Sequence, residues 1–190
     1  SAGEVYFEVD SANFGNKDYY YFNSYGKTFK KYDWIYKVRD QYEAYVRKDD
    51  FAPLRFKREV NEGSTHIRED YIFNSKKNAV YTLRQMEKDS PPVKDTIVFE
   101  YCAYDVLSMI YFARNIDFGI YKAGDKIPIK IVIDNEIHES YIRFIGREEL
   151  KVKDLGSFST IKFSPLLIEG TIFNAGEDMT VWVTDDENKV

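Results

Sequence analysis

The sequence has 190 residues, 27 of them basic and 32 acidic, and a formal net charge of -5. A chain of this length is expected to form one domain, residues 1–190, because it can bury well over half of the surface that it exposes when unfolded. Charges of both signs are interspersed, which argues against a nucleic-acid partner. No run approaches the roughly 18 apolar residues of a membrane-spanning helix, so no transmembrane segment is expected.

The aromatic content of the chain is high, at 17% with 16 Tyr and 14 Phe. Aromatic and β-branched side chains favour strands, so the fold is predicted to be mainly β. The chain has one cysteine, Cys102, which cannot form an internal disulfide. Its apolar neighbours predict a small buried side chain and not a nucleophile.

The first half of the chain is predicted to be a meander of antiparallel strands. Val5, Phe7 and Val9 alternate with more polar residues, and turn residues close each of the segments that follow. A short helical turn is expected within 26–36. The other strands are expected near 19–22, 36–47, 54–60, 65–73, 79–86 and 96–99, with 87–95 as a connection inside the same domain.

The segment from Asp105 to Arg114 is predicted to be one short buried helix. At about 100° per residue, one side of this helix gathers the apolar residues Val106, Leu107, Ile110 and Ala113, and Arg114 shares that side. The hydroxyl and amide groups of Tyr104, Ser108, Tyr111 and Asn115 form a narrow stripe. Asp105 suits the amino-terminal cap and Arg114 the carboxyl end of the helix dipole. Arg114 needs a partner, either an internal carboxylate or carbonyl or the carboxylate or phosphate of a ligand.

The second half of the chain also predicts strands. Ile127, Ile129, Ile131 and Ile133 alternate with other residues and give one apolar face. Further strands are expected near 137–145, 150–152, 158–163, 167–173 and 179–184. The alternation begins inside a strand and the last hairpin lacks its second strand, so the sequence is expected to be trimmed at both ends.

No residue pattern identifies a catalytic or metal site, and no cofactor is expected. The histidines His66 and His138 fall on exposed phases of predicted strands, without the ligand spacing of a metal site. The carboxylate clusters at 148–149 and 185–187 fall at turns, where such residues cap backbone groups. A hydrolase that uses paired carboxylates is therefore an alternative of low weight, and whether the protein is an enzyme stays undecided.

The first quarter of the chain is crowded with tyrosines and one tryptophan. Alternation along a strand forces some of these rings away from the buried face. Such rings suit a sugar, an acyl chain or a partner protein. They are Tyr19, Tyr20, Tyr21, Tyr25, Tyr32, Trp34, Tyr36, Tyr42 and Tyr45.

The helix residues Asp105, Leu107, Ser108, Tyr111 and Arg114 together resemble the signature of a bacterial domain-of-unknown-function family, number 3108. Weaker matches follow in the family's order: 38–43, then Pro53, Arg58 and Gly63, then Pro165 and Gly170, and finally 181–186. The resemblance implies a strongly curved antiparallel sheet, a half-barrel or open barrel that wraps the short helix, similar to lipoprotein-carrier folds. It also implies an exported protein of the Gram-negative envelope, and it provides no catalytic residues.

The sequence thus predicts a non-enzymatic binding domain of the periplasm or cell surface. The first hypothesis is a lipid-like ligand held between the curved sheet and the helix, with polar contacts from Tyr104, Asp105, Ser108, Tyr111 and Arg114. The alternative is a glycan- or protein-binding surface formed by the tyrosine-rich strands. The candidate partners are therefore a lipid, a glycan or an envelope protein.

Overall fold

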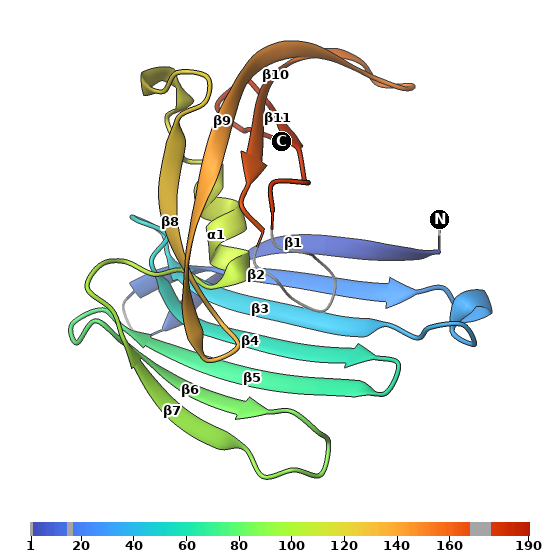
Figure 1. The fold of residues 1–190 in the computed structure, drawn as a ribbon, viewed down its shortest axis with the longest axis vertical. Coiled ribbons are helices and arrows are strands. Elements are labelled where there is room, and N and C mark those ends of the chain that lie inside the picture. The colour runs from blue at the N-terminus through green and yellow to red at the C-terminus, as the bar shows by residue number, and fades with distance from the viewer. Residues whose placement is uncertain (1, 15–16, 168–175) are drawn as a thin grey trace. The chain divides into compact units, whose positions relative to one another are not determined.

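In its described residues, the computed structural model of the chain has two antiparallel sheets and one short α-helix (Figure 1). The structure describes residues 2–14, 17–167 and 176–190. The chain divides into two compact units. Unit 1 consists of Ser1–Tyr111 and Val132–Ile137, and unit 2 of Phe112–Ile131 and His138–Val190.

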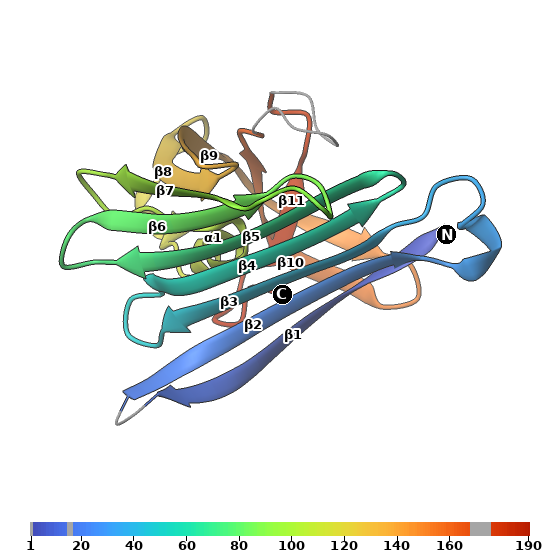
Figure 2. The same cartoon turned by 90° about the horizontal axis from the view of Figure 1, so that it is seen from below.

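The first sheet has seven strands in chain order, each antiparallel to the next. Each strand returns beside the one before it, which produces a meander, because antiparallel neighbours need no long crossover. Figure 2 shows the strands side by side from β1 to β7 in a sheet that curls into a half-barrel. The strands are β1 (Gly3–Phe14), β2 (Lys17–Thr28), β3 (Arg39–Arg47), β4 (Pro53–Glu62), β5 (Thr65–Asn74), β6 (Ala79–Gln85) and β7 (Val93–Val98).

One face of this sheet, called the inner face here, carries the core of unit 1. Phe22, Ala44, Phe56, Tyr71 and Val80 are each at most 1% exposed, and they come from five successive strands. Their side chains meet because every second residue of a strand points to the same face. Ala103, Leu107 and Tyr111 join the same apolar cluster. The opposite face of the sheet is called the outer face.

The helix α1 (Val106–Ala113) packs its first two turns into this cluster. The ring of Tyr111 stacks on the ring of Phe22 with centroids 3.7 Å apart. The predicted buried side of the helix was wrong in part, because Ile110 is 42% exposed whereas Ser108 is fully buried. The Ser108 hydroxyl can be buried because it has hydrogen-bond partners within the helix, described below.

The second sheet has the strand order β11-β10-β9-β8. Its strands are β8 (Lys126–Ile133), β9 (Glu136–Val152), β10 (Gly156–Pro165) and β11 (Val181–Thr184). The predicted apolar face of β8 is confirmed for Ile127, Ile129 and Ile131, which are 5–7% exposed, whereas Ile133 is half-buried. In unit 2 the ring of Phe118 lies 5.6 Å from the rings of both Phe144 and Phe163. Phe118 belongs to a short 3-10 helix, η2 (Phe118–Ile120), and another short 3-10 helix is η1 (Lys30–Tyr32).

The mainly β fold with one short helix is confirmed, and three local predictions need correction. The segments 137–145 and 150–152 form one strand, since β9 runs through 146–149. Gly146 has φ 154°, and the pairing register of β9 with β10 shifts beside it, so this glycine marks a bulge and not a loop. Strand β7 begins at Val93, inside the connection expected at 87–95. Cys102 is exposed, because it lies in the connection between β7 and α1.

One further prediction is confirmed, and others concern residues that the structure does not describe. The short helical turn expected within 26–36 is confirmed by η1. Gly170 and most of the strand expected at 167–173 lie outside the described residues. The helices in the described part of the chain are all too short or too polar to span a membrane.

Candidate functional site

The amino end of α1 is closed by two of the predicted site residues, Asp105 and Ser108. The Asp105 carboxylate accepts hydrogen bonds from the backbone N–H groups of Leu107 (3.0 Å) and Ser108 (2.8 Å). The Ser108 hydroxyl donates to the other carboxylate oxygen at 2.8 Å. Burial raises the pKa of Asp105 to about 6, although these donors lower it. The predicted cap is confirmed, and its hydrogen-bonding capacity is directed into the helix itself.

Tyr104 and Tyr111, the two predicted tyrosine contacts, lie in unit 1 and are each 8% exposed. The backbone carbonyl of Tyr104 accepts a hydrogen bond from the N–H of Val132 at 2.8 Å. Burial raises the pKa of the Tyr104 hydroxyl. Since Tyr111 stacks on Phe22, aromatic rings fill the contact between α1 and the first sheet at this point.

Arg114, the fifth predicted site residue, lies in unit 2 and is half-buried. Its guanidinium Nε donates to the backbone carbonyl of Asn188 at 3.2 Å, and Nη2 donates to the same oxygen. The structure therefore provides an internal carbonyl as the partner that the sequence analysis required. Contact of these five residues with a ligand stays a prediction.

Arg114→Ala is expected to lower the free energy of unfolding by about 0.5–1.5 kcal/mol, because a half-exposed side chain loses one hydrogen-bonded contact. Arg114→Met should lose a similar amount, since it keeps the stem but not the donors. Urea denaturation of both variants measures these differences. A loss above about 3 kcal/mol for either variant would contradict a modest structural role and indicate a buried charge network instead.

Four charged side chains in unit 1 form a cluster that the sequence analysis missed. Arg58 and Arg84 each bring Nε to 2.9 Å from a different oxygen of Glu69. Both arginines also place Nη2 2.6 Å from Oδ1 of Asp134. The side chain of Glu69 is 0% exposed and that of Arg58 is 8% exposed. We call Arg58, Glu69, Arg84 and Asp134 the charged tetrad.

The charged tetrad is internally neutral, with two guanidinium groups and two carboxylates. Burial raises the pKa of Glu69, whereas the nearby Arg58 lowers it. Asp134 and Asn135 have φ of 55° and 62°, so they form the tight turn between β8 and β9. The Tyr71 hydroxyl accepts a hydrogen bond from the N–H of Asn135 at 3.1 Å. These contacts hold the turn against the inner face within unit 1, and this role is structural.

The outer face of β1, β2 and β3 carries two pairs of tyrosines. Tyr6 lies directly opposite Tyr25, and Tyr21 lies directly opposite Tyr45. The rings of Tyr21 and Tyr45 are 4.9 Å apart and inclined by 35°. Tyr6 is 46% exposed and the other three are half-buried.

A row of hydrogen-bonding side chains separates the two tyrosine pairs. Glu8, Asn23 and Glu43 occupy this row, one from each strand. The Asn23 amide donates to Glu8 at 3.1 Å, and the Gln41 amide donates to Asn23 at 3.3 Å. The Tyr21 hydroxyl donates to Glu43. We call this surface the tyrosine face, and it consists of Tyr6, Glu8, Tyr21, Asn23, Tyr25, Gln41, Glu43 and Tyr45.

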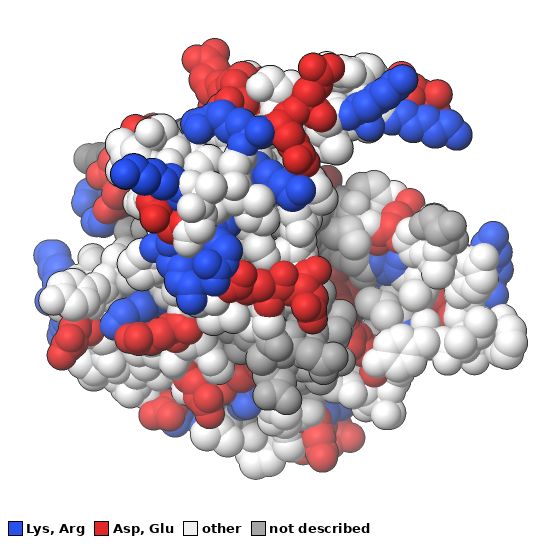
Figure 3. Space-filling model, turned by 45° about the horizontal axis from the view of Figure 1, so that its top comes forward, with Lys and Arg blue, Asp and Glu red and all other residues white. Residues whose placement is uncertain are grey.

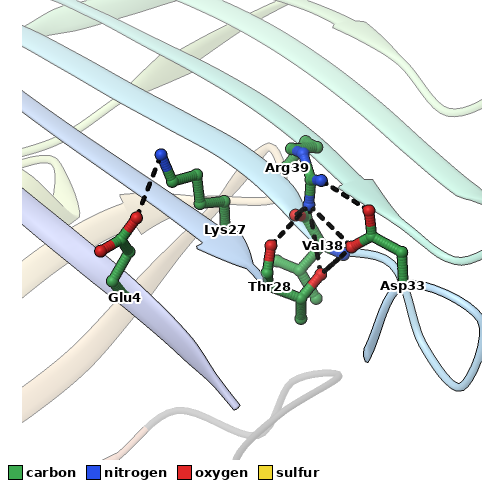
Figure 4. Close-up of polar contacts among 6 residues, drawn as sticks. All are labelled: Glu4, Lys27, Thr28, Asp33, Val38 and Arg39. Carbon is green, nitrogen blue, oxygen red and sulfur yellow. Dashed lines mark hydrogen bonds and ion pairs between the residues drawn. The ribbon is translucent and has the colours of Figure 1, made fainter. Parts of the chain in front are cut away.

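The two ends of the tyrosine face differ. At one end, the ammonium of Lys27 bonds to Glu4 at 3.1 Å and lies over the rings of Tyr6 and Tyr25, 5.5 and 5.9 Å from their centroids. Beyond it, Arg39 and Asp33 form an ion pair of 2.7 Å (Figure 4). At the side, a hollow of about 240 Å³ extends from Gln41 and Glu43 onto β4 and β5.

Three of the other candidate residues, His66, Glu148 and Asp185, have structural partners. His66 Nδ1 is 2.8 Å from the Asn61 side-chain oxygen. Glu148 accepts a hydrogen bond from the Trp182 indole N–H at 2.6 Å, and Asp185 pairs with Arg147 at 2.9 Å. Within residues 2–14, 17–167 and 176–190, no group of His, Cys, Asp and Glu side chains could hold a metal ion. Lys and Arg are interspersed with Asp and Glu on the face seen in Figure 3.

Fold and surface together define a mainly β protein with a half-barrel sheet, a short capped helix and a tyrosine-lined outer face. The chain belongs to the family described as "Protein of unknown function (DUF3108)", which matches residues 1–190. The predicted family membership is confirmed. No curated protein and no solved structure matches the chain.

Proposed function

We propose that the protein is a non-catalytic binding domain of the bacterial cell envelope, and that it binds a glycan through the tyrosine face. The observation that supports this proposal is the alternation of ring pairs and polar side chains on one accessible surface. Sugars present flat C–H surfaces that stack on aromatic rings, and hydroxyl groups that need donors and acceptors beside those rings.

The polar row meets the second requirement of a sugar site. Carboxylate and amide oxygens of Glu8, Asn23 and Glu43 accept hydrogen bonds, and the amides of Asn23 and Gln41 donate them. Their mutual bonds hold these groups in fixed orientations before a ligand arrives, which lowers the entropic cost of binding. The adjoining hollow offers room for a second sugar unit.

Tyr6→Ala and Tyr25→Ala are each expected to weaken glycan binding at least tenfold, which is about 1.4 kcal/mol. The reason is the loss of one of the rings on which the sugar is proposed to stack. Affinity is measured by calorimetry against soluble envelope glycans, including muropeptide fragments and deacylated lipopolysaccharide.

Tyr81→Ala serves as the matched control, because Tyr81 is a 37% exposed tyrosine on β6 of the same sheet. The affinity of the Tyr81→Ala variant for the glycan should equal that of the wild-type protein. Circular dichroism confirms that each variant keeps its strands. If no glycan in the panel binds, or if all three variants lose affinity equally, the tyrosine face is not a sugar site.

Localisation in the periplasm or at the cell surface is part of this proposal. It rests on the envelope character that the family resemblance implies. Fractionation of the source bacterium should recover the protein with periplasmic or outer-membrane markers, and recovery with cytoplasmic markers would refute this part.

A lipid-like ligand beside α1 is the second candidate, with Tyr104, Asp105, Ser108, Tyr111 and Arg114 as its polar contacts. The stacked rings of Tyr111 and Phe22 would have to separate to admit an acyl chain there, so we rank it below the glycan. A bound amphiphile in the native mass spectrum of the gently purified protein would reverse that order.

A further inference from the structure

Strand β1 is an edge of the seven-stranded sheet, and β2 is its one neighbour in the part of the chain that the structure describes. The Phe29 N–H donates to the carbonyl of Ala2 at 3.0 Å, and the Thr28 N–H donates to Val38 on the other side. In an antiparallel pair, hydrogen-bonded residues alternate with residues whose backbone groups point away. Even-numbered residues of β1 therefore bond to β2, and Val5, Phe7 and Val9 direct their backbone N–H and C=O groups to the open edge.

The side chains of the same three residues lie on the inner face and are uncovered. Val5, Phe7 and Val9 are 60%, 58% and 53% exposed. Val5 is opposite Gly26, which has no side chain to cover it, and Phe7 is opposite Ser24. Protein edges are usually protected by charges, prolines or short length. Strand β1 is 12 residues long. Its residues on the inner face at Val5, Phe7 and Val9, called the inner row here, include no charged residue and no proline.

The outer side of β1 is acidic. Glu4 is paired with Lys27, but Glu8 and Asp10 have no ion pair within the described residues. A second copy of β1 is an unsuitable neighbour, because antiparallel pairing centred on Phe7 would set Glu4 opposite Asp10 of the other copy. Like charges directly opposite each other destabilise a strand pair. A strand with Lys or Arg at these positions would instead complement the acidic row.

We propose that β1 is a strand-addition site for an extended segment of a partner protein, in which apolar residues alternate with Lys or Arg. The backbone of the segment would pair with Val5, Phe7 and Val9, and its apolar side chains would cover theirs. Its basic side chains would lie beside Glu8 and Asp10. This proposal shares only Glu8 with the tyrosine face and otherwise uses the open edge, the inner row and Asp10, so it does not depend on the glycan proposal.

The test uses two nine-residue peptides, one of alternating Val and Lys and one of alternating Val and Glu, with affinity measured by fluorescence anisotropy. The Lys peptide is expected to bind, and its affinity should fall as salt rises. The Glu peptide should bind at least tenfold more weakly. Equal affinity for both peptides would overturn the proposal, because it would indicate apolar adhesion without charge recognition.

Val9→Pro tests the backbone pairing directly. Proline removes the N–H that faces the open edge and leaves the bonds to β2 intact, a placement that edge strands tolerate. Binding of the Lys peptide should fall at least tenfold in Val9→Pro and change less than threefold in Val9→Thr. Undiminished binding by a folded Val9→Pro protein would overturn strand addition.

Residue-resolved hydrogen exchange on the wild-type protein gives a second readout that needs no variant. The Lys peptide should slow amide exchange at Val5, Phe7 and Val9. If exchange at these three amides is unchanged when the peptide is bound, strand addition is wrong. Strand addition is also wrong if a detergent micelle competes fully with the peptide and leaves the three amides unprotected, because the inner row then binds amphiphiles. Tyr6→Ala should retain peptide binding, which separates this site from the tyrosine face.

Discussion

Glu69→Ala is expected to lower the free energy of unfolding by about 3–5 kcal/mol, because it leaves two largely buried guanidinium groups with one shared carboxylate. Both oxygens of Glu69 lie 2.9 Å from an arginine nitrogen, and its side chain is 0% exposed. Glu69→Gln should lose nearly as much, since it keeps the shape and removes the charge. Urea denaturation at neutral pH measures both effects.

Asp70→Ala provides the matched control, because Asp70 is the next residue on β5 and faces the other side of the sheet. Its carboxylate pairs with Arg55, and the two side chains are 29% and 42% exposed. A solvated pair of this kind contributes about 0.2–1 kcal/mol. If Glu69→Ala and Asp70→Ala lose the same amount, the charged tetrad does not stabilise unit 1 as argued.

Asp105→Asn is expected to remove a large part of the pH dependence of stability. The folded-state pKa of Asp105 is raised by burial to about 6, from a usual value of 3.8. A raised pKa means that the contribution of the group is complete below pH about 4 and is lost as the pH rises through about 6. Relative to Asp105→Asn, the wild type should therefore lose about 2.5 kcal/mol between pH 4 and pH 7.5.

The asparagine variant suits this measurement because its side-chain oxygen can still cap the helix. Other carboxyl groups, such as Glu69, are present in both proteins and cancel when the two stability curves are subtracted. Asp49→Asn, at a carboxylate with an 80% exposed side chain, is the control for the effect of the same substitution at the surface. A flat difference for Asp105→Asn would show that its carboxyl does not titrate in a buried environment.

Strands could be predicted from the sequence where one face of the strand is apolar and the other is polar. Ile127, Ile129 and Ile131 are buried together because alternation with period two is a direct property of the extended backbone. The curvature of the first sheet was implied only by the family resemblance. Alternation assigns a residue to one of two faces, but it contains no information on how far a sheet curls.

The charged tetrad could not be predicted in the same way, because an exposed position is the usual expectation for charged residues. Arg58 occupies the same phase of β4 as Phe56 and Val60, and Glu69 the same phase of β5 as Tyr71. The signal present in the sequence was that two adjacent strands each have a charged residue at a position whose side chain points into the core. Their fourth partner, Asp134, is 65 residues beyond Glu69 along the chain, too distant for pattern analysis to connect.

The helix shows a different limit. Asp105 was predicted as a cap from residue type alone, and Ser108 was placed in a polar stripe. Hydropathy placed Ile110 on the apolar side of the helix. A hydroxyl that bonds within its own helix loses little on burial, so Ser108 could enter the core while Ile110 remained 42% exposed.

Unit 1 is discontinuous in sequence, and this has a consequence for biosynthesis. The turn that supplies Asp134 and Asn135 belongs to unit 1, yet it is synthesised after residues 112–131 of unit 2. During synthesis, Glu69 is the one carboxylate of the charged tetrad available to Arg58 and Arg84 until Asp134 has been added to the chain. A fragment that stops at Tyr111 should therefore remain a folding intermediate and be bound by chaperones.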